Sequence, residues 1–382
     1  MSPASSFTTR RAFLRACGAL PAAALAGCAI RPAALPATQR LRLLGETTLP
    51  HKMEFRGTTV GGLSGLDHDP ASGTWVALCD DRSELQPARF YTLGVSLDEH
   101  RFAVEVRGVI TLRTAAGLSF PRRQAGGEVV DPESVRLLPG SGGLLWTSEG
   151  DFRARESPSI RHSRLDGTHV REFDVPAALR FAASPGSGAR DNNTFEGLAL
   201  APDGRTAWVA MEAALQQDGP VPGVGRPGGP CRFTAFDIAS GRALRQIAYL
   251  PDAVPHAPLV PGGFTDNGVS EILMADEHRM LVLERAFSLG VGMSLRLYEI
   301  DTRAASDTLS IERMAPGDYR PAAKRLVADF SSLGLSRLDN TEGMCWGPRL
   351  ANGKRTLVCV SDDNFNLLQV TQFVAFEYTE SA

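Results

Sequence analysis

The chain has 382 residues, of which 43% are hydrophobic and 22% charged, as in soluble globular proteins. This composition excludes wholesale disorder and a protein with many membrane spans. The formal net charge of −3 argues against nucleic-acid binding, which needs a basic surface, and suits a cation or a cationic ligand better.

The N-terminal segment predicts export. Thr9–Arg15 matches the twin-arginine export signal, and the apolar run that follows is too short to span a bilayer. Leu25–Cys28 resembles a bacterial lipobox, in which the cysteine is acylated. We predict a twin-arginine lipoprotein signal over 1–27, a linker over 28–39, and a periplasmic or cell-envelope protein that meets the membrane only through lipidated Cys28. The alternatives are a plain cleaved signal and a generic basic leader.

The rest of the chain consists of repeated units. Five segments align, and they open at residues 64, 133, 196, 271 and 342. Such a period is typical of a four-stranded propeller blade with long loops. We predict an all-β fold, a single β-propeller over 40–382 with five blades, and six blades as the alternative.

The predicted strands follow in chain order. The third unit shows all four of them, at 196–200, 206–211, 232–237 and 244–250, with turn residues between them. Further outer strands are expected at 88–93, 102–112, 160–165, 169–175, 294–300 and 308–313. The fifth unit has only 371–378 after its first hairpin, so the N-terminal strand 40–48 should complete it and close the ring. A short helical turn fits 320–335.

Two loops rich in proline and glycine interrupt the pattern, at 216–230 and 252–268. They are either tolerated surface insertions or the rim of a binding channel.

Acidic residues recur at the ends of the first two strands of the units. The first strand begins with Glu133, Glu196, Glu271 and Glu342, and with Ser64 in the first unit. The second strand ends with Asp80, Glu149, Glu212, Glu284 and Asp362. Because inner strands of all blades converge on the propeller axis, these side chains predict a ring of acids at one mouth of the channel.

Such a ring predicts a cation site. Clustered carboxylates repel one another, and Ca²⁺ or another divalent cation takes several carboxylate and carbonyl oxygens. The candidate metal ligands are Asp80, Asp81, Glu149, Glu196, Glu271, Glu284, Asn340, Glu342, Asp362 and Asp363. The candidate catalytic residues are Glu133 and Glu212 as bases, and Arg82 and Arg285 as holders of an anionic group. The alternative is that the acids only cap strand ends.

Two cysteines lie on the fifth predicted hairpin. If Glu342 faces Asp362, then Cys345 faces Cys359. The pair is either a cross-strand disulfide or two buried free thiols.

Several of these motifs together resemble the phytase-like family, described as esterase-like activity of phytase. The motifs that carry the resemblance are 62–66, 79–82, 131–134, 193–198, 283–285, 339–344 and 361–365, and the similarity covers roughly 58–378. The resemblance implies a β-propeller and ester or phosphoester hydrolysis.

Two functions follow from these observations. The first is a monomeric, metal-dependent esterase or phosphoesterase that acts on a small anionic substrate at the acidic mouth. The second is a non-catalytic propeller lipoprotein that binds a ligand or partner at the cell envelope, since propellers host both kinds of function.

Overall fold

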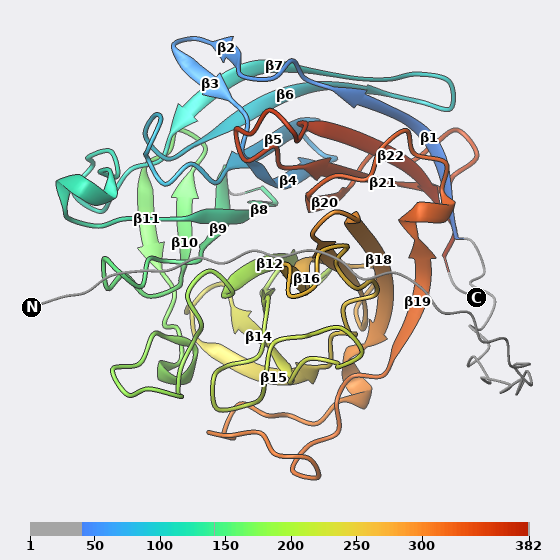
Figure 1. The fold of residues 1–382 in the computed structure, drawn as a ribbon. Helices are drawn as coiled ribbons and strands as arrows, with labels where there is room; N and C mark the ends of the chain where they lie inside the picture. Colours follow the sequence, from blue (N-terminus) through green and yellow to red (C-terminus); the bar gives the residue numbers. More distant parts are fainter. Residues whose placement is uncertain (1–39, 141, 381–382) are drawn as a thin grey trace, which may run out of the picture. The chain divides into compact units, whose positions relative to one another are not determined.

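The computed structural model describes residues 40–140 and 142–380, so the predicted signal peptide and Cys28 lie outside the described residues. Five four-stranded antiparallel sheets surround a central axis, with β4, β8, β12, β16 and β20 innermost (Figure 1). The protein is a five-bladed β-propeller, as the repeats predict, and the six-bladed alternative is excluded.

The strands of each blade follow one another from the axis outward. Blade one holds β4 (Leu63–Asp69), β5 (Thr74–Cys79), β6 (Arg89–Leu97) and β7 (Phe102–Thr111). Blade two holds β8 (Pro132–Leu138), β9 (Gly143–Ser148), β10 (Ser159–Arg164) and β11 (His169–Glu172). Blade three holds β12 (Phe195–Leu200), β13 (Thr206–Met211), β14 (Cys231–Asp237) and β15 (Ala243–Tyr249). Blade four holds β16 (Thr265–Met274), β17 (Arg279–Ser288), β18 (Gly292–Asp301) and β19 (Lys324–Asp329).

The two ends of the described chain meet in blade five. Its strands are β20 (Thr341–Trp346), β21 (Arg355–Ser361), β22 (Gln372–Tyr378) and β1 (Leu41–Thr48). β1 pairs with β22 from Leu41 opposite Tyr378 to Thr48 opposite Gln372. This confirms the predicted closure of the ring by the N-terminal strand. A small hairpin, β2 (Met53–Phe55) and β3 (Thr58–Val60), follows β1.

The predicted outer strand of blade four is wrong. The segment 308–313 is not a strand, and β19 takes that place in the sheet. The earlier segment packs on blade three, where Thr308 N–H donates to Gln246 O and Met314 N–H donates to Asp218 Oδ1. A short 3-10 turn, Phe330–Ser332, lies within 320–335 as expected, and three others are Arg123–Ala125, Ala177–Leu179 and Thr302–Ala304.

The hydrophobic core lies between neighbouring blades. Side chains alternate between the two faces of each strand, so Ala207 and Val209 of β13 pack toward blade two, while Trp208 and Ala210 pack toward blade four. The alternation explains why the inner strands are apolar at successive positions. Among the described residues, no helix has the length and apolar character needed to cross a membrane.

Of the two alternatives for Cys345 and Cys359, the structure has the two buried free thiols and not the cross-strand disulfide. A bulge at Glu342 shifts the register of β20 against β21, so that Cys359 lies opposite Met344, and Cys345 opposite Val358. The two thiols therefore point into different interblade cores, and both are buried and free.

Candidate functional site

Every inner hairpin carries a β-bulge at the same place. The register shifts at Ser64, Glu133–Ser134, Glu196, Ser270 and Glu342. The shift lies at the start of the inner strand in four blades and within the longer β16 in blade four. A bulge leaves a residue outside the ladder and re-aims its side chain. Four of the five hairpins then close in the same way. The N–H groups of Asp80, Glu149, Glu212 and Asp362 donate to the carbonyls of Gly62, Asp131, Thr194 and Asn340 over 2.7–2.9 Å.

Blade four is shifted by one residue from the predicted alignment. Val269 pairs with Glu284 and Gly268 with Arg285, so the residues equivalent to the acids of the other blades are Ser270 and Arg285. The prediction that Glu271 and Glu284 belong to the ring is therefore wrong. Blade four supplies a guanidinium group where the other blades supply a carboxylate.

Glu271 occupies a position that is glycine in three other blades. A Cβ atom on Gly343 would lie 2.9 Å from Ser64 O, and one on Gly65 would lie 2.8 Å from Glu133 O, because neighbouring inner strands cross closely there. In blade four the side chain of Glu271 enters the axis instead. Its carboxylate accepts hydrogen bonds from Leu198 N at 2.9 Å and Ser134 Oγ at 2.8 Å.

Arg136 of β8 completes this cluster. It lies 2.9 Å from Glu271 and donates to the carbonyls of Leu66, Ile272 and Met344. Burial raises the pKa of Glu271 to about 7, although Arg136 opposes the shift. This axial ion pair, Arg136–Glu271, contacts all five blades and is structural.

Three other predicted ligands also have structural partners. Glu284 accepts hydrogen bonds from Tyr249 Oη at 2.5 Å, Lys324 Nζ at 2.6 Å and Asn267 Nδ2 at 3.0 Å. Asp81 pairs with Arg89 at 2.7 Å and caps the backbone of the loop after β5. Asp363 accepts from Gly62 N at 2.9 Å. None of the three lines the cavity described next.

The remaining acids gather at one mouth of the channel, around a cavity of about 970 Å³. We call them the acidic ring: Asp80, Asp131, Glu133, Glu149, Glu196, Glu212 and Glu342, with Asp362 directly behind them. Arg82, Arg285 and Asn340 line the same cavity. The sequence therefore predicted most of the ring correctly, and it missed Asp131.

The ring is electrostatically unfavourable when nothing is bound. Burial, and then neighbouring carboxylates, raise the pKa of Glu133, Glu149 and Glu196 well above the usual range. Burial also raises the pKa of Asp131 to about 6 and that of Glu212 to about 7, against the opposing effect of Arg82 and Arg285 respectively.

The two arginines reach the ring from different blades. Arg82, in the loop after β5, pairs with Asp131 and donates to Asn192 Oδ1 at 2.6 Å. Arg285 of β17 lies 3.0 Å from Glu212 and 3.7 Å from Glu342. Each guanidinium thus neutralises part of the ring and leaves most of its carboxyl groups without a cationic partner.

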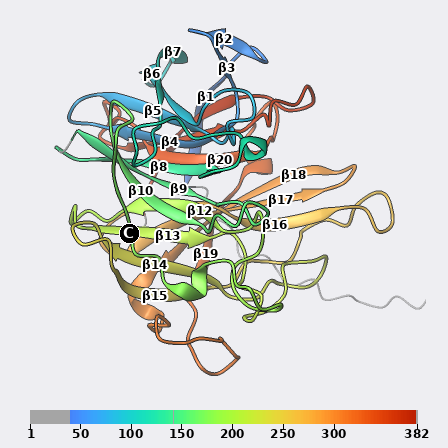
Figure 2. The same cartoon turned by 90° about the vertical axis from the view of Figure 1, so that its left-hand side faces the viewer.

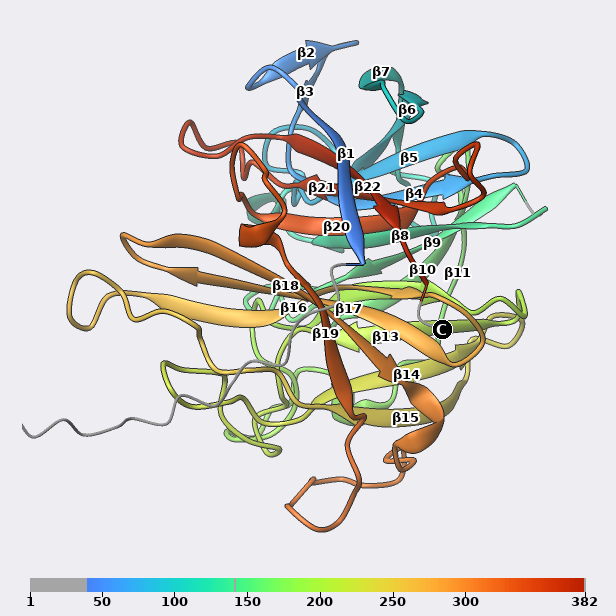
Figure 3. The same ribbon diagram turned by 90° about the vertical axis from the view of Figure 1, so that its right-hand side faces the viewer.

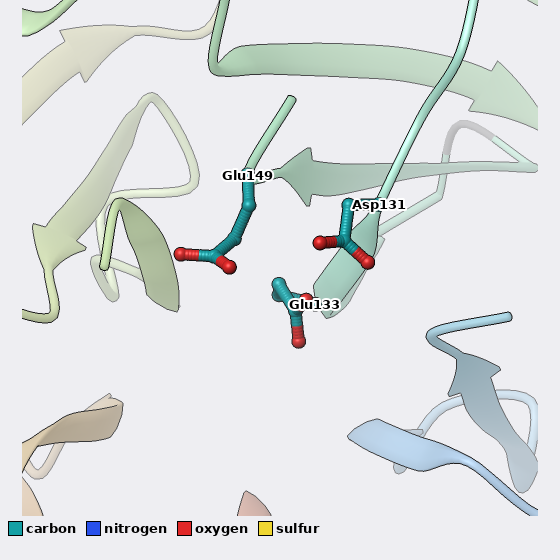
Figure 4. Close-up of side chains that lie close together, drawn as sticks. All are labelled: Asp131, Glu133 and Glu149. Atoms are coloured by element: carbon teal, nitrogen blue, oxygen red, sulfur yellow. The ribbon is translucent and has the colours of Figure 1, made fainter. Parts of the chain in front are cut away.

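Two groups of three carboxylates have metal-ligand spacing. Asp131, Glu133 and Glu149 offer oxygen atoms within 4.8 Å of one another, and so do Glu149, Glu196 and Glu212. Figure 4 shows the first group, turned toward a common space between the start of β8 and the end of β9. Hard divalent cations prefer such oxygen sets. The buried Oδ1 atom of Asn340, another oxygen at this mouth, has no hydrogen-bond partner.

Two further residues of the site, Asp131 and Asn193, were not predicted. Asp131 lies two residues before a bulge, as the predicted ligand Asn340 does, and the carbonyls of both accept equivalent hydrogen bonds. That shared position in the repeat is the signal that identifies Asp131. Asn193, whose Nδ2 donates to Glu212 Oε2 at 2.6 Å, carries no repeat signal.

Comparisons with known proteins agree with this architecture. The model of the family described as "Phytase-like: Esterase-like activity of phytase" matches residues 58–365. None of the curated proteins compared with the chain matches it significantly.

Three solved structures are similar to it at low sequence identity. A hypothetical protein from Leishmania major has 9% identity and a TM-score of 0.43, over 88% of this chain and 91% of that one. The periplasmic gluconolactonase PpgL of Pseudomonas aeruginosa has 14% identity and a TM-score of 0.37, over 85% and 88%. Hydrazine synthase of Kuenenia stuttgartiensis has 12% identity and a TM-score of 0.35, over 86% and 67%.

Proposed function

The chain belongs to the phytase-like family, and from that premise we propose that it is an exported, calcium-dependent esterase or phosphoesterase that works at the acidic ring. The observation that carries the proposal is that Glu149 belongs to both carboxylate triads. Buried carboxylates at this spacing repel one another, and a divalent cation relieves that repulsion.

The residues present fit such a cation. The triad Asp131, Glu133 and Glu149 would hold it, with Glu196 and Glu212 on the other side of Glu149. A bound calcium ion would polarise the ester or phosphoester oxygen and lower the pKa of a water molecule.

Glu212 is the better placed of the two candidate bases. Asn193 and Arg285 hold its two carboxylate oxygens at 2.6 Å and 3.0 Å, which fixes its orientation toward the cavity. A base held this way accepts the proton of an attacking water. Glu133 is the alternative base, and it takes that role where it is not a ligand.

Arg82 and Arg285 would bind the anionic group of the substrate. Both guanidinium groups line the cavity, and each is held by an acid of the ring, Asp131 and Glu212 respectively. A guanidinium group fixed in this way presents its remaining N–H groups to a carboxylate or phosphate.

The location of the protein is a separate part of the proposal. The twin arginines and Cys28 predict export and a lipid anchor at the cell envelope. Cys28→Ala should move the protein from the membrane fraction to the soluble periplasmic fraction, and Arg10→Lys with Arg11→Lys should keep it in the cytoplasm. Unchanged fractionation of both variants would contradict this part.

The activity is tested with aryl phosphate and aryl ester substrates. Purified protein is assayed on p-nitrophenyl phosphate and p-nitrophenyl butyrate, with CaCl₂ or with EGTA. We expect turnover that requires calcium and falls about 100-fold or more in Glu149→Gln. Glu105→Gln, an exposed acid on β7, is the matched control and should behave as the wild type.

One result would contradict the proposed hydrolase. No turnover on either substrate, with a melting temperature that ignores calcium and EGTA, would contradict the hydrolase. It would favour the non-catalytic binding propeller.

A further inference from the structure

One wall of the cavity is apolar. β16 and β17 have 10 residues each, whereas β12 and β13 have 6, and the added length runs past the ring because Thr265 pairs with Ser288. Figures 2 and 3 show this part of blade four projecting on one side of the propeller. The projection places Phe264, Phe287 and Met293 on the cavity wall.

Blades four and five both supply apolar side chains to this wall. The rings of Phe264 and Phe287 lie 6.1 Å apart, and Phe264 is 65% exposed. Blade five adds Leu338 and Leu368, and the Leu368 side chain is 78% exposed. We call Phe264, Phe287, Met293, Leu338 and Leu368 the apolar wall.

Other elements supply polar side chains to the same cavity. Arg82, Asp191, Asn192 and Asn193 line it, all from blade one and from the segment before β12. Single exposed apolar residues are common, but a group of them that continues into a charged cavity marks a ligand surface. The cavity therefore combines the acidic ring with other polar residues and with the apolar wall.

The charge of the cavity disfavours a substrate with many phosphates. Among the described residues that line it, ten are acidic and three are arginines, so added negative charge meets repulsion. Arg82, Arg285 and Arg337 are each paired with an acid of the chain. One bound calcium ion would offset part of this charge only.

Resting on the proposed function, we infer that the substrate is an amphiphilic ester with one polar reacting group and one apolar chain. The reacting group lies on the acidic ring, and the chain lies against the apolar wall. A dissolved ester and an ester in a lipid surface share this chemistry.

Chain-length dependence tests the inference. The full chain, with calcium, is assayed on p-nitrophenyl acetate and p-nitrophenyl octanoate below their solubility limits, and on the octanoate in phosphatidylcholine vesicles. We expect kcat/KM to be at least about tenfold higher for the octanoate, because several methylene groups leave water. A higher rate in vesicles identifies a lipid surface as the source, and a higher rate in solution identifies a dissolved ester.

Variants locate the effect. Phe264→Ser combined with Leu368→Ser should reduce the octanoate-to-acetate ratio about tenfold. Leu259→Ser is the matched control, because Leu259 is 72% exposed near the same hairpin but does not line the cavity. Equal kcat/KM for both esters, or the same loss of ratio in Leu259→Ser, would overturn the inference while the hydrolase stands.

A binding measurement separates the two proposals. Octylphosphonate and methylphosphonate are titrated into the protein by calorimetry. Tighter binding of octylphosphonate that Phe264→Ser and Leu368→Ser weaken supports the apolar wall even when no ester is hydrolysed. Equal affinity for the two phosphonates overturns it whatever the outcome of the activity assays.

Discussion

Glu196 and Glu271 lie on neighbouring inner strands, and both are buried, yet their surroundings differ. Glu271 has Arg136 and two hydrogen-bond donors from other blades. Glu196 faces Glu149, Glu212 and Glu342, and Arg285 offsets only part of that repulsion. The comparison teaches that this propeller neutralises one buried acid, Glu271, with its own arginine, and gives the other, Glu196, mainly acidic neighbours.

The largest expected effect is on the internally neutralised acid. Arg136→Met leaves Glu271 buried without its cation, which should lower the free energy of unfolding by about 3–5 kcal/mol. Urea denaturation measures the loss. Arg136→Met combined with Glu271→Gln should recover part of it, because a neutral amide replaces the buried carboxylate that lost its cation. A loss below about 1 kcal/mol would show that the axial ion pair does not hold the blades together.

The next largest effect is the stabilisation of the acidic ring by calcium. Calcium at 100 times its dissociation constant should raise the free energy of unfolding by about 2.7 kcal/mol, because it binds only the folded ring. Thermal unfolding in CaCl₂ and in EGTA measures this. Glu149→Gln should abolish the gain, since Glu149 belongs to both triads, and Glu105→Gln should retain it. An equal gain in all three proteins would place the ion elsewhere.

The repeats made most of this architecture predictable. Strand alternation, turn residues and the recurring acids identified five blades, their inner hairpins and the closing strand at 40–48. These features are local, since each depends on residues within one hairpin. The strand predicted at 308–313 failed because that segment packs on blade three, a contact between distant residues.

The site was less predictable for a related reason. A bulge moves the register by one residue, which reverses the direction of every following side chain. Alignment of acid with acid therefore placed Glu271 and Glu284 in the ring and paired Cys345 with Cys359. The glycines at 65, 197 and 343 mark the position after the bulge in three blades, where neighbouring inner strands cross closely, but blade four has Glu271 there and so lacks this signal.

The pH dependence of stability gives a smaller effect. Asp131 and Glu212 have folded-state pKa values raised by burial to about 6 and about 7, so the folded protein binds more protons than the unfolded chain between about pH 4 and 7. Without metal, stability should therefore fall as pH rises through that window, by about 2 kcal/mol per pH unit. Thermal unfolding in EGTA across this range measures the slope.

Calcium should flatten that slope, because the bound ion keeps the ring ionised in the folded state. Acids with lowered pKa values do not obscure it. Hydrogen bonds from Arg42 and Lys354 hold the pKa of Glu377 at about 2, so its contribution is lost as pH falls from about 5 and is constant between about pH 5 and 7. Stability that rises between about pH 5 and 7 in EGTA would contradict the raised values.

The smallest expected effect is the change in stability when Glu196 or Glu271 is replaced by glutamine, and it distinguishes these two acids most directly. Glu196→Gln should change the metal-free stability near neutral pH by less than about 1 kcal/mol, because burial and its acidic neighbours already favour the protonated form of Glu196, which glutamine resembles. In calcium the same variant should be less stable than the wild type, since a ligand oxygen loses its charge. Glu271→Gln should instead be less stable than the wild type in both buffers. The buried guanidinium group of Arg136 loses its carboxylate partner in this variant, with or without calcium. Urea denaturation of both variants, with and without calcium, measures these four changes in the free energy of unfolding. If Glu196 binds the ion and Glu271 stabilises the fold, the loss of stability in Glu196→Gln should require calcium. The loss in Glu271→Gln should be the same with and without calcium.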